Sequence, residues 1–409
     1  MQSLDPALYA RLEKNIWKYA LLLITNKRIF AAIQAAFYLS IPDVTVASLG
    51  LIILISSMAG FFLEIPSGYI ADKLGHKESL IFSRILLLIS TTIFLFADSL
   101  AFLIAGGALL SVSQAFMSGT GSAFMHDTLR ALGREKDYAT VIGKVTSIGF
   151  AVPIAFTVLI PFLVVYGYKV PFLISIVFDI VGLYAAIALT KPPVTKAEIE
   201  EINTTNFRQV LAEGYRLHFL AFALFSGIVS GLLFTTGVYR DAYLVALQVP
   251  VIWFGVFFGT GRVLASLLLA YTGKIKSYFT IYSFMKFQIL LYFSLYITLG
   301  ITDNLTVIIA ILILSNGFQW GLSKVDQSFL IEIIRDSKFK ATLLSTRSQI
   351  DSLVVAVAGF GLGYLIETTS FSVGYLTLAG VFAILLLPLY LYIRHRRKSG
   401  HHNNVFLNN

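Results

Sequence analysis

The sequence predicts an all-α membrane protein with twelve transmembrane helices in two six-helix bundles. Of its 409 residues, 57% are hydrophobic and 13% are charged, whereas about 25% of the residues of a soluble domain are charged. The hydrophobic residues form long blocks, such as 80–97, 170–189 and 372–393, and about 20 apolar residues are enough to cross ~30 Å of hydrocarbon. The alternating ten-residue segments typical of a membrane β-barrel are absent from the sequence.

The polar breaks between the blocks place the twelve spans. They lie near 19–40, 45–71, 78–97, 100–126, 140–165, 169–190, 214–238, 248–272, 277–299, 304–331, 342–366 and 371–393. Before the first span, Asp5 and Pro6 predict a short interfacial helix with Asp5 as its N-cap. The first 18 residues lack the apolar core and cleavage site of a signal peptide.

Lysine and arginine are distributed unevenly among the connections. With both termini in the cytoplasm, nearly all basic residues of the connections lie on the cytoplasmic side, and only Lys169 and Arg240 lie opposite. This bias is the positive-inside pattern of a multi-pass protein, and it explains the net charge of +9 without nucleic acid. We expect a plasma membrane location, the inner membrane in a bacterium.

The longest connection divides the chain. We expect an N-terminal bundle over 1–190, a cytoplasmic linker with a short surface helix over 191–213, and a C-terminal bundle with a basic cytoplasmic tail over 214–409. Thr195 and Glu198 form a capping box that predicts the start of the linker helix. The chain has no cysteine, which excludes disulfides and thiolate metal sites.

An internal repeat relates the two halves. The stretch "SGTGSAFMHDTLRALG" (118–133) aligns without gaps with "SKVDQSFLIEIIRDSK" (323–338). The alignment matches Asp127 with Glu332, and Arg130 with Arg335. Upstream, Gln114 matches Gln319. Two related bundles of six spans are the architecture with which transporters alternate access around a central site.

A polar motif separates the second and third spans. The stretch "GYIADKLGHK" (68–77) resembles the loop signature of the major facilitator superfamily, Gly-x-x-x-Asp-Arg/Lys-x-Gly-Arg-Arg/Lys. The stretches "LEIPSG" and "HDTLRALGREKDY" resemble bacterial members of its drug-exporter-like branch. Two features usual in proton-antiporting exporters are missing, namely a Gly-Pro pair in the fifth span and an embedded arginine in the fourth.

The resemblance implies a latch at the cytoplasmic mouth. Gly68 would allow close helix packing, Gly75 a tight turn, and Asp72 a cap on the amino end of span eleven near residues 341–342. The motif set comprises Gly68, Asp72, Lys73, Gly75, His76, Lys77, Asp127, Arg130, Glu332 and Arg335. His76 replaces the usual arginine, which would make the latch pH-sensitive. The alternative is a solvated turn that only sets topology.

Polar residues at membrane depth are the candidates for substrate contact or coupling, since a charge there costs several kcal/mol. These candidates are Lys27, Arg28, Gln34, Glu64, Gln114, Arg262, Gln319, Lys324, Asp326, Arg347 and Asp351. Glu64 is either a protonatable coupling group or one side of a salt bridge with Arg347 or Arg262. Arg347 and Asp351 are four residues apart and either pair locally or face the cavity.

The resemblance also places spans three, six and nine outside the cavity. Arg84, Asp179 and Lys286 are therefore expected to connect helices. The leading interpretation is a secondary transporter that moves a small organic or amphipathic solute by rocker-switch alternating access, with proton-coupled export as one option. It would need no cofactor or metal and would act as a monomer in the lipid bilayer.

Two other interpretations stay open. One is an organic-anion uniporter or exchanger that uses Lys27, Arg28, Lys324 and Arg347. The other is a membrane receptor or scaffold that transports nothing. The sequence contains no nucleotide-binding loop, zinc signature or nucleophile motif, so we expect no enzyme.

Overall fold

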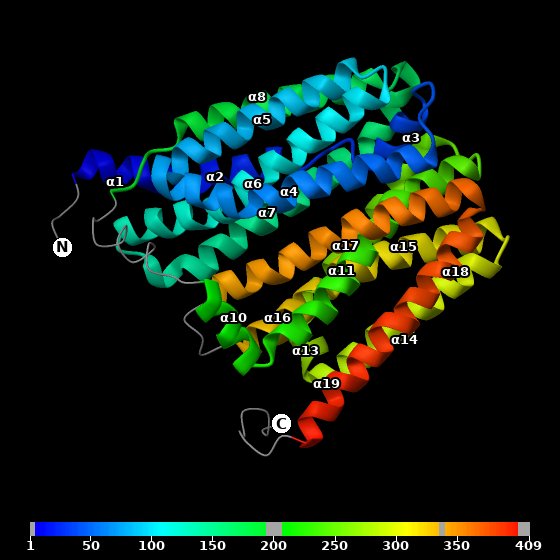
Figure 1. The fold of residues 1–409 in the computed structure, drawn as a ribbon. Coiled ribbons are helices and arrows are strands. Elements are labelled where there is room, and N and C mark those ends of the chain that lie inside the picture. The colour runs from blue at the N-terminus through cyan, green and yellow to red at the C-terminus, as the bar shows by residue number, and fades with distance from the viewer. Residues whose placement is uncertain (1–4, 194–206, 335–339, 400–409) are drawn as a thin grey trace. The chain divides into compact units, whose positions relative to one another are not determined.

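The computed structural model describes residues 5–193, 207–334 and 340–399, and within these ranges it contains helices and no strands (Figure 1). The helices of the first half are α1 (Pro6–Glu13), α2 (Asn15–Asn26), α3 (Gln34–Leu39), α4 (Val46–Leu74), α5 (His76–Phe96), α6 (Leu100–Ala131), α7 (Tyr138–Leu159) and α8 (Lys169–Ala188). Short 3-10 helices at Glu135–Asp137 and Ile160–Tyr166 flank α7.

The second half begins with α10 (Phe207–Arg216) and α11 (Phe219–Ala246). It continues with α12 (Phe254–Ala270), α13 (Thr272–Ser277), α14 (Ile281–Ile301), α15 (Leu305–Gly321), α16 (Ser323–Ile333), α17 (Lys340–Thr368), α18 (Phe371–Val381) and α19 (Leu387–Ser399). A 3-10 turn at Val251–Trp253 precedes α12, and a π-helical turn at Phe382–Leu386 joins α18 to α19. The expected linker helix and its capping box at Thr195 lie outside the described residues.

Eleven segments of the described chain are long and apolar enough to cross a membrane. They correspond to spans two to twelve of the sequence prediction. The first span differs, because it consists of α2 and α3 with a non-helical stretch over residues 27–33 between them. Non-helical backbone at membrane depth is found where it is buried in protein or lines a cavity, and this break contains two of the candidate cations, Lys27 and Arg28.

The short connections contain the residues that start the next helix. Asp5 accepts a hydrogen bond from the Ala7 amide, as expected for α1. Thr45 and Ser48 form a capping box at α4, and Asn304 accepts from two amides of α15. These side chains satisfy amides that a helix start leaves without a partner. Local sequence therefore fixes where these helices begin.

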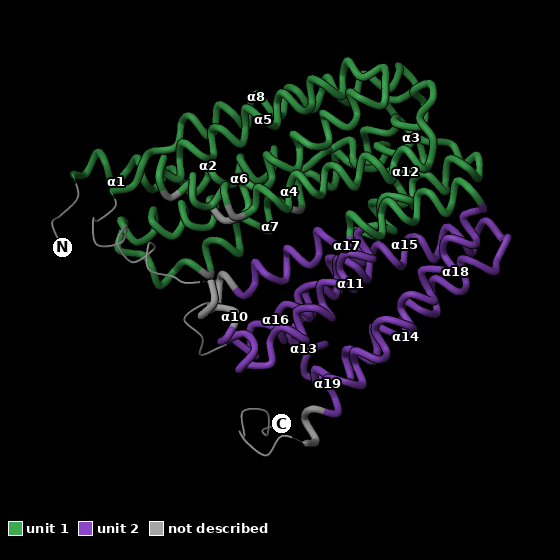
Figure 2. Tube along the Cα trace, in the orientation of Figure 1, with its two compact units in different colours: residues 1–205, 235–262, 355–368 green, residues 206–234, 263–354, 369–409 purple. Residues whose placement is uncertain are grey.

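The chain forms two compact units that do not follow the two halves of the sequence (Figure 2). Unit 1 contains residues 1–205 together with 235–262 and 355–368 from the second half. Unit 2 contains residues 206–234, 263–354 and 369–409. The ends of α11 and α17, and most of α12, thus pack with the first six spans.

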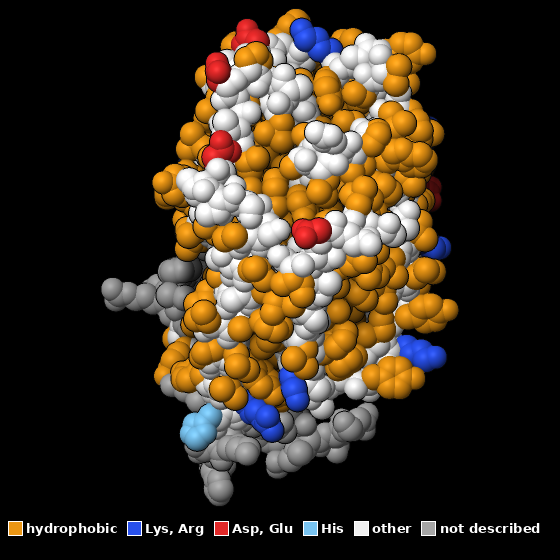
Figure 3. All heavy atoms as spheres, turned by 90° about the vertical axis from the view of Figure 1, so that its right-hand side faces the viewer, with side chains coloured by type: hydrophobic (Ala, Val, Ile, Leu, Met, Phe, Trp, Pro, Cys, Tyr) orange, Lys and Arg blue, Asp and Glu red, His pale blue; other side chains and the backbone are white. Residues whose placement is uncertain are grey.

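Each unit has its own apolar core. In unit 1, α5 and α6 pack on each other, and α2 packs on α7 and α8. Tyr19, Leu22 and Phe124 lie in the core that joins these helices. In unit 2, Phe219, Leu330 and Leu343 form a buried cluster between α11, α16 and α17. Outside the cores, hydrophobic side chains predominate on the face drawn in Figure 3, as expected for a surface that contacts lipid.

The end of the seventh span differs from the sequence prediction. Arg240 was expected in an outer connection after a span that ends at residue 238. The structure extends α11 to Ala246, and both Arg240 and its neighbour Asp241 are buried. The two side chains neutralise each other through an ion pair of 2.8 Å, so the helix continues through them.

Candidate functional site

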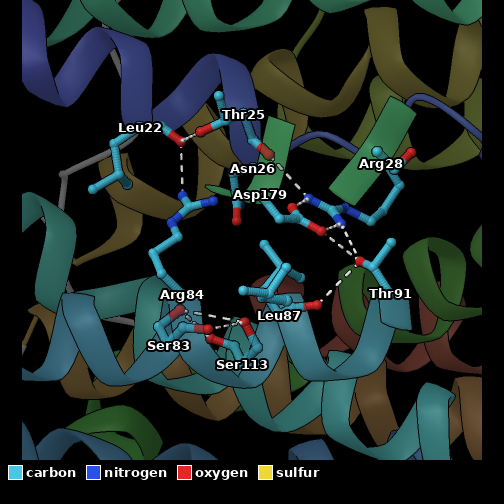
Figure 4. A network of polar contacts seen from close by, with 12 residues as sticks. Leu22, Thr25, Asn26, Arg28, Ser83, Arg84, Leu87, Thr91, Ser113 and Asp179 are labelled. Atoms are coloured by element: carbon cyan, nitrogen blue, oxygen red, sulfur yellow. Dashed lines mark hydrogen bonds and ion pairs between the residues drawn. The ribbon is translucent and has the colours of Figure 1, made fainter. Parts of the chain in front are cut away.

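Arg28 is bound to Asp179 inside unit 1 (Figure 4). Its guanidinium donates to both carboxylate oxygens, at 3.0 and 2.7 Å, and also to the Thr25 carbonyl at 2.9 Å. Thr91 on α5 donates to Asp179 at 2.5 Å and accepts from Arg28 at 3.0 Å. The break in the first span is thus tied to α5 and α8 by a bidentate ion pair, which combines charge with fixed geometry.

A second guanidinium lies in the same network. Arg84 is fully buried and donates to the Leu22 carbonyl at 2.7 Å, and its charge attracts that of Asp179. Two arginines therefore share one carboxylate here. The sequence expectation that Arg84 and Asp179 connect helices agrees with these contacts, and Arg28 belongs to the same connection.

A basic cluster lies elsewhere in unit 1. Lys27, at the end of α2, is within electrostatic reach of Arg262 on α12, and Arg262 is within reach of Arg240 on α11. The guanidinium carbons of Arg240 and Arg262 lie 4.9 and 4.7 Å from the ring centroid of Phe258. The fold therefore brings together candidates from spans one and eight, and Asp241 pairs with Arg240 beside them.

Other candidates in the first four spans form hydrogen bonds with uncharged side chains. Ser118 on α6 donates to Glu64 on α4 at 3.1 Å, and the described part of the chain shows no ion pair for Glu64. The amides of Gln114 and Asn26 bond to each other at 3.2 and 3.4 Å, which joins α6 to α2. Gln34 donates to Tyr38, one turn further along α3, at 2.7 Å.

The acidic candidates of the second half meet in unit 2. Ser226 on α11 donates to Asp326 on α16 through a short hydrogen bond and accepts from Arg347 on α17 at 3.1 Å. Asp351, one turn beyond Arg347, is attracted to the same guanidinium and bonds to Ser230. Arg347 is therefore bonded to Ser226 and is within electrostatic reach of two carboxylates, and among the described residues it makes no direct ion pair with Asp351.

The other candidates of unit 2 are Lys324 and Gln319, which lie outside this network. Lys324 on α16 is exposed and donates to Gln327 at 2.7 Å. Gln319 is half-buried on α15. No group of three His, Cys, Asp or Glu residues suited to a metal ion occurs in the parts of the chain that the structure describes.

The polar motif after α4 forms a sharp turn with a charge contact. Gly75 has φ of +105° and ends α4, in a conformation available to glycine. His76 lies 2.9 Å from Asp127 at the end of α6, and Arg130 lies 3.3 Å from the other Asp127 oxygen. Asp127, a member of the motif set, thus contacts His76 in the position where the family has arginine. The pH sensitivity of this contact stays a prediction.

The matching position of the repeat makes the matching contact. Glu332 on α16 pairs with Lys276 on α13 at 2.8 Å. In each half, the acid at the end of the fourth span therefore contacts a base in the connection between the second and third spans. The repeat detected in the sequence corresponds to a repeated contact between an acid and a basic side chain.

Other motif residues differ from expectation or cannot be followed. Gly68 is not at a close helix approach, because a Cβ at this position would meet no atom of the described chain within 4 Å. Lys73 lies 5.1 Å from the ring of Tyr69 on its own helix, and Lys77 is half-buried. The side chain of Asp72 and all of Arg335 lie outside the described residues.

Sequence reasoning missed several polar partners. Ser226, Thr91 and Asn26 are neutral residues in apolar helices, where serine and threonine commonly bond to their own backbone. Nothing in their local sequence distinguishes them. Asp241 carried a signal, since an Arg-Asp dipeptide next to a long apolar block is unusual, but the span was predicted to end before it.

Comparison with known proteins identifies the family of the chain. Residues 19–325 match the sequence profile of the Major Facilitator Superfamily. No curated protein matches the chain at a significant level. The drug-exporter-like branch is not identified by any of these comparisons.

Several solved structures are similar in fold. A mutant of the nucleoside transporter NupG has a TM-score of 0.77 and 14% identity, over 93% of this chain and 99% of that chain. A bacterial homologue of the human lysosomal transporter Spinster, inward-facing and unoccupied, has a TM-score of 0.70 and 15% identity, over 98% of this chain and 100% of that chain. A POT family transporter in complex with a thioalcohol-conjugated peptide has a TM-score of 0.65 and 11% identity, over 94% of this chain and 96% of that chain. At these identities the likeness concerns the fold.

Proposed function

The chain belongs to the major facilitator superfamily, and we propose that it moves a small organic or amphipathic solute by rocker-switch alternating access. As a member of this family with this fold it is a polytopic membrane transporter and not an enzyme. The similar structures include a nucleoside transporter and a transporter in complex with a peptide conjugate, which supports a polar organic solute.

The network around Arg347 is the observation that carries the proposal. Asp326, Asp351 and Arg347 lie on spans ten and eleven at membrane depth and meet around Ser226 of span seven. Ionisable groups in such places are costly and mark solute or proton pathways. With two carboxylates beside one guanidinium, a single proton can change the net charge of the group from negative to neutral, which supports proton coupling.

The finer features of the proposal depend on the sequence. We propose membership in the drug-exporter-like branch, export from the cytoplasm, a monomer, and a bacterial inner membrane location with both termini inside. The stretches "LEIPSG" and "HDTLRALGREKDY" support the branch, and the positive-inside bias supports the cytoplasmic termini. A receptor or scaffold is the less favoured alternative, because it has no use for buried charge networks in both units.

Transport by purified protein in liposomes tests the coupling. A solute is first selected by thermal shift, and its uptake is then measured with and without a pH gradient. We expect the gradient to stimulate uptake, and Asp326→Asn to abolish the stimulation while solute exchange continues. Asp303→Asn, in an exposed connection, is the control. If wild-type uptake ignores the gradient, proton coupling is wrong.

The basic cluster favours a second candidate, an organic-anion uniporter or exchanger. Lys27, Arg262 and Arg240 approach one another at membrane depth, and a cluster of cations offsets the desolvation of an anion. For this candidate, uptake is indifferent to a pH gradient. Arg262→Gln would raise the KM of an anionic solute about tenfold, the effect of one lost charge-assisted hydrogen bond, and would leave a neutral analogue unaffected.

A further inference from the structure

Glu367, in the last turn of α17, caps the first turn of α4. The amides of Val46 and Ala47 donate to its Oε2 atom at 3.1 and 3.3 Å. Within α4 itself, Thr45 accepts from the Ser48 amide. The amides that the start of α4 leaves without helical partners are thus shared between its own cap and a carboxylate more than 300 residues away. A negative charge at this place also interacts favourably with the helix dipole.

Glycines bring the same two helices into backbone contact. A Cβ on Gly50 of α4 would lie 3.0 Å from the Gly359 carbonyl oxygen and 3.1 Å from the Phe360 Cα. A Cβ on Gly363 would lie 3.0 Å from the Val46 carbonyl oxygen and 3.1 Å from the Gly50 Cα. These neighbours are backbone atoms, so they cannot move aside as a flexible side chain does. Small residues allow such close contact between membrane helices.

A third helix joins the contact. The hydroxyl of Tyr239 on α11 donates to the Gly359 carbonyl at 2.6 Å. Tyr239, residues 355–368 and α4 all belong to unit 1, whereas residues 340–354 of the same α17 belong to unit 2 (Figure 2). Elements from the two halves of the sequence are therefore joined at the end where α4 begins, which the charge bias predicts to be the outer one.

We propose that Glu367 and the glycine contact form an outer latch that holds the external mouth closed. The carboxylate is exposed, so water can replace it on the amides of Val46 and Ala47 when the helices separate. The contact is then reversible, and its strength sets the share of molecules with a closed outer mouth. This inference rests on the alternating access proposed above and assigns residues to its external side.

Distance measurements on a cysteine-free background test the carboxylate. Spin labels at Asp98→Cys and Asp303→Cys, both exposed in predicted outer connections, report the width of the outer mouth. Glu367→Ala removes a helix cap, and we expect the ratio of open to closed populations to rise about fivefold. Glu367→Gln keeps one acceptor and should have a smaller effect. Asp43→Asn removes a charge three residues before α4 without removing a cap, and should change nothing.

Glycine substitutions test the contact independently. Gly363→Ala introduces a methyl group against the Tyr239 hydroxyl of α11 and the backbone of α4, so it strains the three-helix contact, and we expect it to favour the open mouth. Gly361→Ala is the matched control on the same helix, because a Cβ there meets nothing within 4 Å among the described residues. Gel filtration confirms that each variant is folded before labelling.

Two outcomes would overturn the latch, and they are distinguishable. If the wild type shows two distances but Glu367→Ala behaves as Asp43→Asn, and Gly363→Ala behaves as Gly361→Ala, the latch is wrong and alternating access stands. If one narrow distance persists in every variant with and without solute, both the latch and alternating access are wrong.

Discussion

At the scale of single residues, pairing decides what a membrane-depth charge does. Arg28 was a candidate for substrate contact, but both of its terminal nitrogens bond to Asp179. Arg347 has the opposite balance, because it bonds to Ser226 and attracts two carboxylates, Asp326 and Asp351. The first arrangement fixes helices, and the second is the one on which the proposed proton coupling depends. The sequence analysis placed Arg28 and Arg347 in one class of candidates, since both lie at a similar predicted depth, whereas Asp179 was expected to connect helices.

Asp179→Asn tests the structural assignment. The substitution leaves Arg28 and Arg84 buried without a carboxylate, and breaking a buried pair costs about 3–5 kcal/mol. We expect a loss of this size in the free energy of unfolding, measured by denaturant titration in detergent. Asp303→Asn, at an exposed site, should change it by less than about 0.5 kcal/mol. A loss below about 1 kcal/mol would contradict the assignment.

At the scale of elements, two helix ends depart from regular geometry close to candidate residues, one after α2 and one after α4. The break over residues 27–33 holds Lys27 and Arg28, and Arg28 itself bonds to the Thr25 carbonyl of the last turn of α2. Cations stabilise the carboxyl end of a helix in this way. At the end of α4, Gly75 has φ of +105° and ψ of 146°, a region that only glycine occupies without strain.

Gly75→Ala is predicted to destabilise the protein. The strained backbone costs about 1–3 kcal/mol, and the new methyl group would also meet the Glu78 carboxylate. Gly143→Ala on α7 is the control, because its Cβ meets nothing within 4 Å of the described chain and alanine favours a helix by up to ~1 kcal/mol. Thermal unfolding of both variants gives the comparison. Equal stabilities would show that the turn tolerates a side chain.

At the scale of the whole molecule, the orientation in the membrane follows from charge. Basic residues gather in the connections that adjoin Lys73, Lys136 and Lys274, whereas the opposite connections are short, contain acids such as Asp98 and Asp303, and have almost no lysine or arginine. Arg240, in the outer set, is buried in α11 and paired with Asp241, so it adds no net charge on that side.

Labelling of single cysteines in intact cells checks this orientation. The natural chain has no cysteine, so each introduced thiol is the only target. We expect Asp303→Cys to react with a membrane-impermeant maleimide, and Lys136→Cys to react only after permeabilisation, because the positive-inside rule retains its connection in the cytoplasm. Reaction of Lys136→Cys in intact cells would reverse the topology and move the proposed outer latch to the inner mouth.

The sequence by itself determined the membrane class, the approximate spans, the repeat and the glycine turn at Gly75. These features depend on composition and on short stretches of sequence. The thickness of the hydrocarbon fixes the length of each span, and backbone sterics require glycine at a positive φ. The repeated acid at Asp127 and Glu332 was also visible, because the two halves use the same position.

Only the tertiary structure decided which charges meet. Asp179 pairs with Arg28, 151 residues away in the sequence. Ser226 bonds to both Asp326 and Arg347. Glu367 accepts hydrogen bonds from amides at the start of α4. It also decided that Gly68 faces open space while Gly50, Gly359 and Gly363 form the close contact. Partners on different helices depend on helix rotation and packing, and in lipid these are set by side-chain shape and hydrogen bonding rather than by hydrophobicity.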